Sequence, residues 1–157
     1  MRKRILDLPE KQAASDDTSW LNLDNLADVE ITSEDPVHPI EAALLPNRTS
    51  GWRAGRTGEQ TIRLLFSSPQ RVRRIRLNFV ESGTERTQEY VLRWSQDGGK
   101  TFRDIARQQW NFSPQGSTSE TEDHHVDLSS VTVLELCIIP DIGGNRVPAT
   151  LDQMRVA

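Results

Sequence analysis

The stretch Arg74–Phe79 reads RIRLNF, so that large apolar side chains occupy every second position. The same alternation occurs in Thr61–Phe66 (TIRLLF) and in Leu134–Ile138 (LELCI). A period of two residues is that of a β-strand with one buried face. These segments therefore predict a protein built from strands.

Turn signals divide the rest of the chain into further strands. Asp97-Gly98-Gly99 is the strongest signal, because a tight hairpin needs positive φ values, which Asp tolerates and Gly adopts without steric cost. Alternation and turn residues together predict strands at 27–33, 60–66, 72–81, 87–96, 101–110, 123–128, 132–139 and 149–156, with a short helix within 40–45. This spacing is typical of an all-β fold, an antiparallel β-sandwich of the jelly-roll kind.

The chain has 157 residues, which is an ordinary size for one domain. Residues 1–26 mix charges, Ser and Asp with a few apolar residues, and we expect them to form an arm that packs on the domain. The domain itself is expected to span 27–157. The single cysteine, Cys137, forms no intrachain disulfide, and its apolar surroundings in sequence predict a small buried hydrophobic residue.

Composition and missing motifs argue against several classes of protein. The net charge of -4 disfavours nonspecific binding to nucleic acid. The first residues lack the apolar stretch of a signal peptide, and no apolar run is long enough to span a bilayer. No Gly-x-Ser-x-Gly, phosphate-loop, zinc-protease or dinucleotide motif occurs. We therefore expect a cytoplasmic protein that is not an enzyme and has no nucleic-acid or membrane partner.

Two polar clusters are better explained as strand faces than as ligand sites. His124 and His125 have acidic neighbours, but adjacent residues of a strand point to opposite faces and do not easily share one metal ion. The arginines within 71–76 form a basic stripe that alternates with Ile75 and Leu77, as on a solvated strand face. We expect neither a metal nor a nucleic acid at these positions.

Three connections are long enough to build a binding surface, namely 34–52, 111–122 and 141–148. Trp110 and Asn111 stand where a strand enters the second of them. A ring with a neighbouring amide offers a sugar an apolar face and hydrogen bonds to its hydroxyl groups. The alternative is that a ring here, Trp110 or Phe112, closes the end of the core.

Two arginines are further candidates. Arg86 is grouped with Glu81, Gln88 and Glu89 around the connection between two strands, where they either grip a ligand or form a structural ion-pair network. Arg146 follows two glycines in a loop, so its planar bidentate donor is either presented to a ligand or left in solvent. The sequence leaves both alternatives open.

Several motifs carry a family resemblance through their order and spacing: Gly51-Trp52-Arg53-Ala54, Gln60–Phe66, Glu89–Gly98 (EYVLRWSQDG) and Ala149-Thr150-Leu151. After residue 26 the chain resembles a discoidin-like, galactose-binding-like domain, related to the coagulation-factor C-type repeats and to bacterial carbohydrate-binding modules. The resemblance implies a jelly-roll sandwich whose loops bind ligands at one end.

The same resemblance raises the question of a structural metal. Members of this family often hold Ca²⁺ with backbone carbonyls and an acidic side chain in the loop before the Trp, plus a Glu near the C-terminus. The resemblance places this loop at 45–49 and the Glu at Gln153. An amide and an arginine are poor substitutes for carboxylates around a hard cation. We therefore expect no cofactor, with Asn47 and Asp152 as the weak candidates for calcium ligands.

Two functions follow from these observations. The resemblance implies a non-catalytic carbohydrate-binding module. Its sugar is expected to be bound by Trp110, Trp52, Asn111, Arg86, Arg146 and His38, the two rings by stacking and the others by hydrogen bonds. The alternative is an intracellular protein–protein interaction module on the same fold, which suits a cytoplasmic chain with one cysteine.

Overall fold

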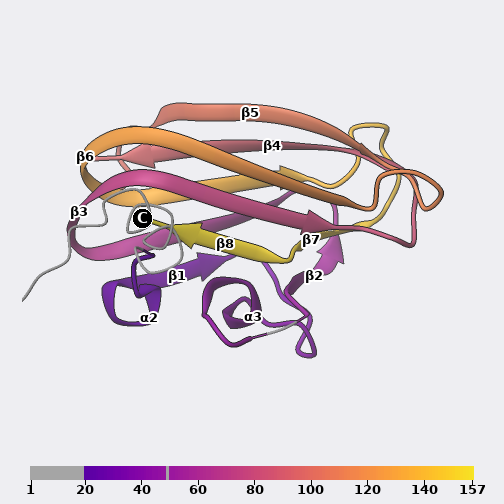
Figure 1. Cartoon of the computed structure of the whole chain (residues 1–157), viewed down its shortest axis with the longest axis horizontal. Helices are drawn as coiled ribbons and strands as arrows, with labels where there is room; N and C mark the ends of the chain where they lie inside the picture. Colours follow the sequence, from indigo (N-terminus) through magenta and orange to yellow (C-terminus); the bar gives the residue numbers. More distant parts are fainter. Residues whose placement is uncertain (1–19, 49) are drawn as a thin grey trace, which may run out of the picture.

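The computed structural model describes residues 20–48 and 50–157 as a sandwich of antiparallel strands (Figure 1). Its helices are α2 (Leu23–Leu26) and α3 (Glu41–Leu44), and its strands are β1 (Ala27–Ile31), β2 (Trp52–Thr57), β3 (Gln60–Val80), β4 (Arg86–Ser95), β5 (Arg103–Phe112), β6 (Ser119–Ile139), β7 (Pro148–Leu151) and β8 (Gln153–Val156). The predicted all-β jelly-roll sandwich and the short helix within 40–45 are confirmed. No helix in these described ranges is long and apolar enough to cross a membrane.

The two long strands β3 and β6 pair with each other from Gln60 opposite Ile138 to Val80 opposite Ser119. The prediction of two separate strands in place of each is wrong. Polar residues at 67–71 and 129–130 look like loops in the sequence, but they lie where both strands bend, at the left of Figure 1. Register shifts between Leu65 and Arg74 accommodate this bend.

The bend carries β3 and β6 from one layer of the sandwich to the other. In the first layer the strand order is β1, β3, β6, β4, β5, and in the second the later part of β3 lies between β6 and β8. The rings of Phe79 on β3 and Tyr90 on β4 meet between the layers, with centroids 5.3 Å apart. Because β3 and β6 fold back, the turn 81–85 and the loops 113–118 and 140–147 lie at the same end of the sandwich.

The second, two-stranded sheet pairs β2 with β7. β2 was not expected from the sequence, because Trp52–Thr57 contains two arginines and a glycine instead of alternating large apolar residues. That glycine, Gly55, allows a close approach, since a Cβ there would lie 2.6 Å from the carbonyl oxygen of Glu34. The single strand predicted at 149–156 is wrong: Asp152 separates β7, which pairs with β2, from β8, which pairs with β3.

The connection predicted at 111–122 is shorter than expected. β5 continues to Phe112 and β6 begins at Ser119, so the loop is confined to 113–118. Phe112 is buried and closes the end of the core, as the structural alternative required. Asn111 consequently belongs to a strand and not to a loop.

The described part of the predicted arm, residues 20–26, lies against the sandwich, while residues 1–19 fall outside the described residues. The backbone N–H of Leu21 donates to the carbonyl of Val156 at 2.7 Å, and Leu23 is part of the core. The Trp20 ring centroid lies 4.8 Å from the guanidinium carbon of Arg74, within the range of a cation–π contact.

Cys137 is half-buried on the outer face of β6, so the prediction of a small buried hydrophobic residue is wrong. Alternation along the strand sends Leu136 and Ile138 into the core and Cys137 outward. On this face Glu135 is fully buried and accepts hydrogen bonds from Arg63 Nε, at 2.6 Å, and from Arg93. Burial raises the pKa of the Cys137 thiol, which makes it a weak nucleophile.

His124 and His125 point to opposite faces of β6. His124 Nε2 lies 2.7 Å from the hydroxyl oxygen of Tyr90 between the layers, whereas His125 is exposed. Glu120 and Glu122 share the inner face with His124. Burial, a hydrogen bond to Glu122 and the negative charge of Glu122 raise the pKa of Glu120 to about 7. Among the described residues, no three His, Cys, Asp or Glu side chains are arranged to hold a metal ion.

We predict that Glu120→Gln stabilises the protein at about pH 8 and leaves its stability nearly unchanged at about pH 4. A carboxyl group whose pKa is raised from 4.5 to about 7 on folding favours the folded state only while it stays protonated. This contribution is lost as the pH rises from about 4.5 through about 7. Because the group is partly solvated, we expect a gain of about 1 kcal/mol in the free energy of unfolding, measured by urea denaturation.

Glu59→Gln, in the exposed turn before β3, is the matched control, and it should change stability equally little at both pH values. A Glu120→Gln variant with the same stability change at both pH values would contradict the raised pKa.

Candidate functional site

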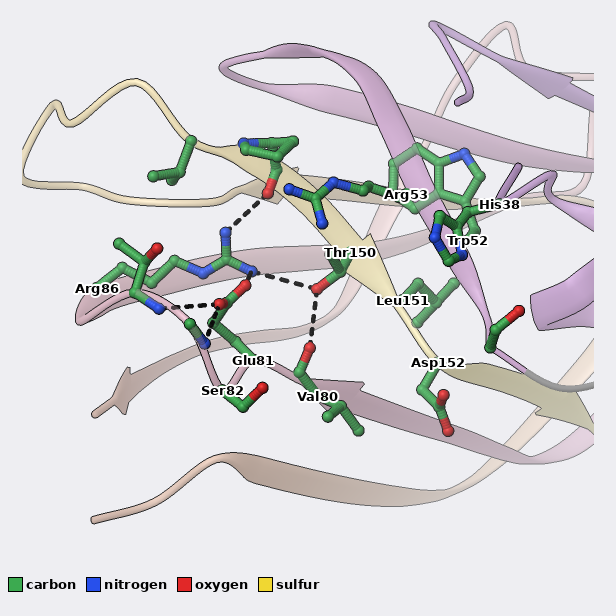
Figure 2. A pocket seen from close by; sticks show the side chains of 15 residues that line it. His38, Trp52, Arg53, Val80, Glu81, Ser82, Arg86, Thr150, Leu151 and Asp152 are labelled. Carbon is green, nitrogen blue, oxygen red and sulfur yellow. Dashed lines mark hydrogen bonds and ion pairs between the residues drawn. The ribbon is translucent and has the colours of Figure 1, made fainter. Parts of the chain in front are cut away.

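A cleft of about 470 Å³ lies at the end of the sandwich that carries the loops (Figure 2). Its walls come from segments that are far apart in the sequence: the loop 34–40, the start of β2, the turn 81–85 and β7 with its flanking residues. Five of its lining residues matter most for its chemistry: His38, Arg53, Val80, Arg86 and Asp152. The return of β3 to this end therefore assembles a concave surface from otherwise separate loops.

The loop 34–40 is attached to β2 by its backbone. The N–H of Asp35 donates to the carbonyl of Arg53 at 2.8 Å, and the N–H of Arg53 donates to the carbonyl of His38 at 3.1 Å. The Asp35 carboxylate accepts the N–H of Val37 at 2.9 Å and so closes the turn between them. These bonds hold the His38 ring at the edge of the cleft, where Nδ1 has no hydrogen-bond partner among the described residues.

Arg86 forms the floor of the cleft. Its guanidinium donates to the carbonyl of Pro148 at 2.7 Å and to the hydroxyl of Thr150 at 3.2 Å, and it lies 3.0 Å from Glu81 Oε2. Burial lowers the pKa of Arg86, and the negative charge of Glu81 opposes that shift. The side chain is only 1% exposed, so the structural ion-pair alternative applies. The terminal nitrogens of Arg86 are engaged, and its buried Nε has no partner among the described residues, so these contacts favour a supporting role over the direct ligand binding expected from the sequence.

Arg53 is the second arginine that lines the cleft. Its side chain is exposed on the cleft wall, and no hydrogen bond or ion pair of its guanidinium is found within the described part of the chain. Its positive charge is close enough to lower the pKa of Arg86, after the larger effects of burial and Glu81. Figure 2 shows both guanidinium groups directed toward the same region of the cleft. Arg53 is thus available to bind an anion or several hydroxyl groups.

Trp52 does not present its ring to the cleft as a stacking surface. It is 1% exposed, and its indole N–H donates to the carbonyl of Ser33 at 3.1 Å. The prediction that it stacks on a sugar is therefore wrong: the alternation of β2 turns Trp52 into the core and Arg53 into the cleft. The exposed apolar side chain at this site is Val80, which is 43% exposed.

The other three predicted ligand residues lie outside the cleft. Trp110 and Asn111 occupy successive positions of the edge strand β5, so their side chains face opposite sides. Trp110 is partly exposed and donates from Nε1 to Ser117 Oγ at 3.1 Å, while Asn111 accepts a hydrogen bond from the Thr87 hydroxyl at 2.7 Å. Arg146 is exposed in the loop 140–147 and does not line the cleft.

The residues at the calcium candidates do not fit a hard cation. Asn47 is exposed in the loop after α3, and Asp152 separates β7 from β8. The guanidinium of Arg155 donates to the carbonyl oxygens of Ala43, at 2.9 Å, and Leu45, at 3.3 Å. Leu45 begins the loop 45–49 where the family resemblance places a calcium site, and Ala43 lies just before it in α3, so both oxygens already face a positive charge. Calcium would require several free oxygen ligands there, with carboxylates among them.

Comparisons with known proteins support the fold. The family model described as "F5/8 type C domain" matches residues 28–141. A search of curated proteins finds no match. Among solved structures, CpGH89CBM32-5 from Clostridium perfringens, in complex with GalNAc-β-1,3-galactose, is 21% identical with a TM-score of 0.61, covering 87% of this chain and 98% of that one.

Two further solved structures are similar over most of both chains. The family 32 CBM of C. perfringens NanJ, in complex with galactose, has 15% identity, a TM-score of 0.64 and coverages of 87% of this chain and 96% of that chain. A chitosan-binding module from a chitosanase/glucanase of Paenibacillus sp. IK-5 has 17% identity, a TM-score of 0.62 and coverages of 87% and 98%. At these identities the likeness shows a shared fold.

Proposed function

Because this chain belongs to the F5/8 type C domain family, we propose that it is a non-catalytic carbohydrate-binding module whose ligand occupies the cleft beside Arg53. The observation that carries the proposal is the combination of a preformed concave site with one unengaged guanidinium on its wall. A site built for sugar needs fixed polar donors around a shaped hollow, and it needs no nucleophile or general base.

The geometry of the floor supports recognition without chemistry. The terminal guanidinium nitrogens of Arg86 contact Glu81 and Thr150, and Thr150 Oγ1 also donates to the carbonyl of Val80 at 3.2 Å. A floor held by several such bonds is rigid, which lowers the entropy cost of holding a ligand. Arg53 and His38 then provide the polar contacts on the wall, and Val80 provides a small apolar contact.

The structural relatives support the ligand class. Two of them, from C. perfringens, were determined in complex with GalNAc-β-1,3-galactose and with galactose, and a third is a chitosan-binding module. Each covers 87% of this chain. Carbohydrate is the ligand class that these relatives share.

We predict that His38→Ala and Arg53→Ala each weaken binding to a glycan by about tenfold, because each removes a polar contact from the wall of the cleft. A glycan array would first identify a binding sugar, and isothermal titration would then measure the affinity of each variant. Chemical-shift mapping should place the perturbed amides at 37–38, 52–53, 80–84 and 147–152.

Arg146→Ala is the matched control, because this exposed arginine lies at the same end of the molecule but outside the cleft. Its affinity should equal that of the wild type. Chemical-shift perturbations centred on Trp110 and Asn111 would show that the sugar binds at β5 instead of the cleft. The absence of binding to any glycan would refute the proposed function.

A further inference from the structure

We propose that the sugar bound in this cleft carries a carboxylate, which binds at the Arg53 end. This inference rests on the proposed function and specifies its class of ligand. It follows from an imbalance of charge within the cleft.

The imbalance of charge arises because both carboxylate oxygens of Glu81 already have partners. One of its oxygens accepts the backbone N–H groups of Gly83 and Thr84, at 2.8 and 3.0 Å, and the other lies 3.0 Å from Arg86. Glu81 therefore compensates the charge of Arg86 and has no remaining contact with Arg53. The other carboxylate of the cleft, on Asp152, lies at the opposite side in Figure 2. Among the residues that line the cleft, the Arg53 end thus holds two guanidinium groups and one carboxylate, while Asp141, which does not line the cleft, also acts on Arg86 and leaves Arg53 as the charge without a partner.

A carboxylate is the group that best fits this end of the cleft. The planar guanidinium of Arg53 matches the two oxygens of a carboxylate in a bidentate pair, which is stronger than a hydrogen bond to a neutral hydroxyl. Arg86 is nearby but buried, so its charge adds attraction without direct contact. Because Arg53 is exposed, water and salt screen the pair, and the preference should be moderate and dependent on ionic strength.

The test compares sugars that differ only in the carboxylate. An array of uronic-acid oligosaccharides would be printed beside their carboxyl-reduced counterparts, which keep the same ring stereochemistry and linkage. We expect the acidic member of the bound pair to bind about three- to tenfold more tightly at low salt, with the difference shrinking in high salt. Titration calorimetry of the bound pair would confirm the ratio.

Arg53→Gln should reduce this ratio to about one, because it removes the bidentate partner of the carboxylate, and it should weaken binding of the neutral sugar by no more than the roughly tenfold expected for Arg53→Ala. Arg146→Gln, which removes an arginine outside the cleft, should keep the ratio. Equal binding of acidic and neutral sugars by the wild type would overturn this inference and leave the proposed function intact. Failure to bind either kind of sugar would overturn both.

The geometry points to a second and independent inference, that Arg155 replaces a structural metal ion in fixing the wall of the cleft. Its guanidinium donates to the carbonyls of Ala43, Leu45 and Met154, at 2.9, 3.3 and 3.0 Å. One cation therefore joins α3 and the loop after it to β8. This is the structural role that bound calcium plays when loop carbonyls converge on it.

The segment held by Arg155 continues into the cleft. Ser50 lines the cleft wall, and Gly51 packs so closely on the junction between β7 and β8 that a Cβ there would lie 2.7 Å from Asp152 Cα. Gly51 has a φ of +62°, which favours glycine, so the loop adopts one demanding conformation. A fixed cation at its start keeps this conformation without a metal, and ligand binding should therefore be independent of calcium.

The thermal midpoint of wild-type unfolding tests whether the fold depends on a bound calcium ion. It should be the same in millimolar CaCl₂ and in EDTA. Arg155→Gln should lower the midpoint by about 5 °C, because three carbonyl oxygens lose their charged donor. Arg155→Glu should be destabilised in EDTA and partly recover in CaCl₂, since it adds the carboxylate that a calcium site lacks. Arg107→Gln, on the exposed outer face of β5, is the control and should change the midpoint little.

A rise in the wild-type midpoint with calcium would overturn this inference, and so would an Arg155→Gln midpoint equal to that of the wild type. The wild-type comparison decides the question even if the variants at Arg155 fail to fold.

Discussion

The pairing of β3 with β6 along their whole length is the constraint on which the rest of this structure depends. Both strands bend and change layer together, so β4 and β5 join one half of the pair while β8 joins the other. The register shifts at the bend change which positions face inward, from Ile62 and Leu64 to Ile75 and Leu77. One ladder therefore sets both layers of the core and brings the loops of the cleft to one end.

The sequence predicted the class of fold because alternation is strong wherever a strand has one buried face. It did not predict continuity through the bend, since Pro69 and the serines around it have the composition of a loop. The hydrogen-bond ladder between β3 and β6 resumes beyond them, because these side chains point into solvent and leave the packing of the core unchanged. β2 was missed for a related reason, that its inward positions hold only Trp52 and Ala54.

Which site residues could be predicted also depended on which strands and turns are visible in the sequence. His38 and Arg86 do reach the cleft, because the turns that carry them are visible in the sequence. Arg53 was missed because its role depends on recognising β2: once Trp52 is placed in the core, alternation puts Arg53 on the opposite side, toward the cleft. Trp110 was favoured as an exposed ring before a long loop, but the loop is short and the ring bonds to it.

The arginines of this protein show why residue type alone does not identify a binding group. Arg86 and Arg155 are held by backbone carbonyls from segments distant in sequence: Arg86 links β4 to β7, and Arg155 links β8 to α3 and the loop after it. A chain with one cysteine has no intrachain disulfide for this purpose, and a guanidinium with several donors joins such segments well. Arg53 differs from these two in being exposed and in having no acceptor among the described residues. The acceptors around an arginine, which the sequence does not reveal, therefore decide whether it supports the cleft or is left to meet a ligand.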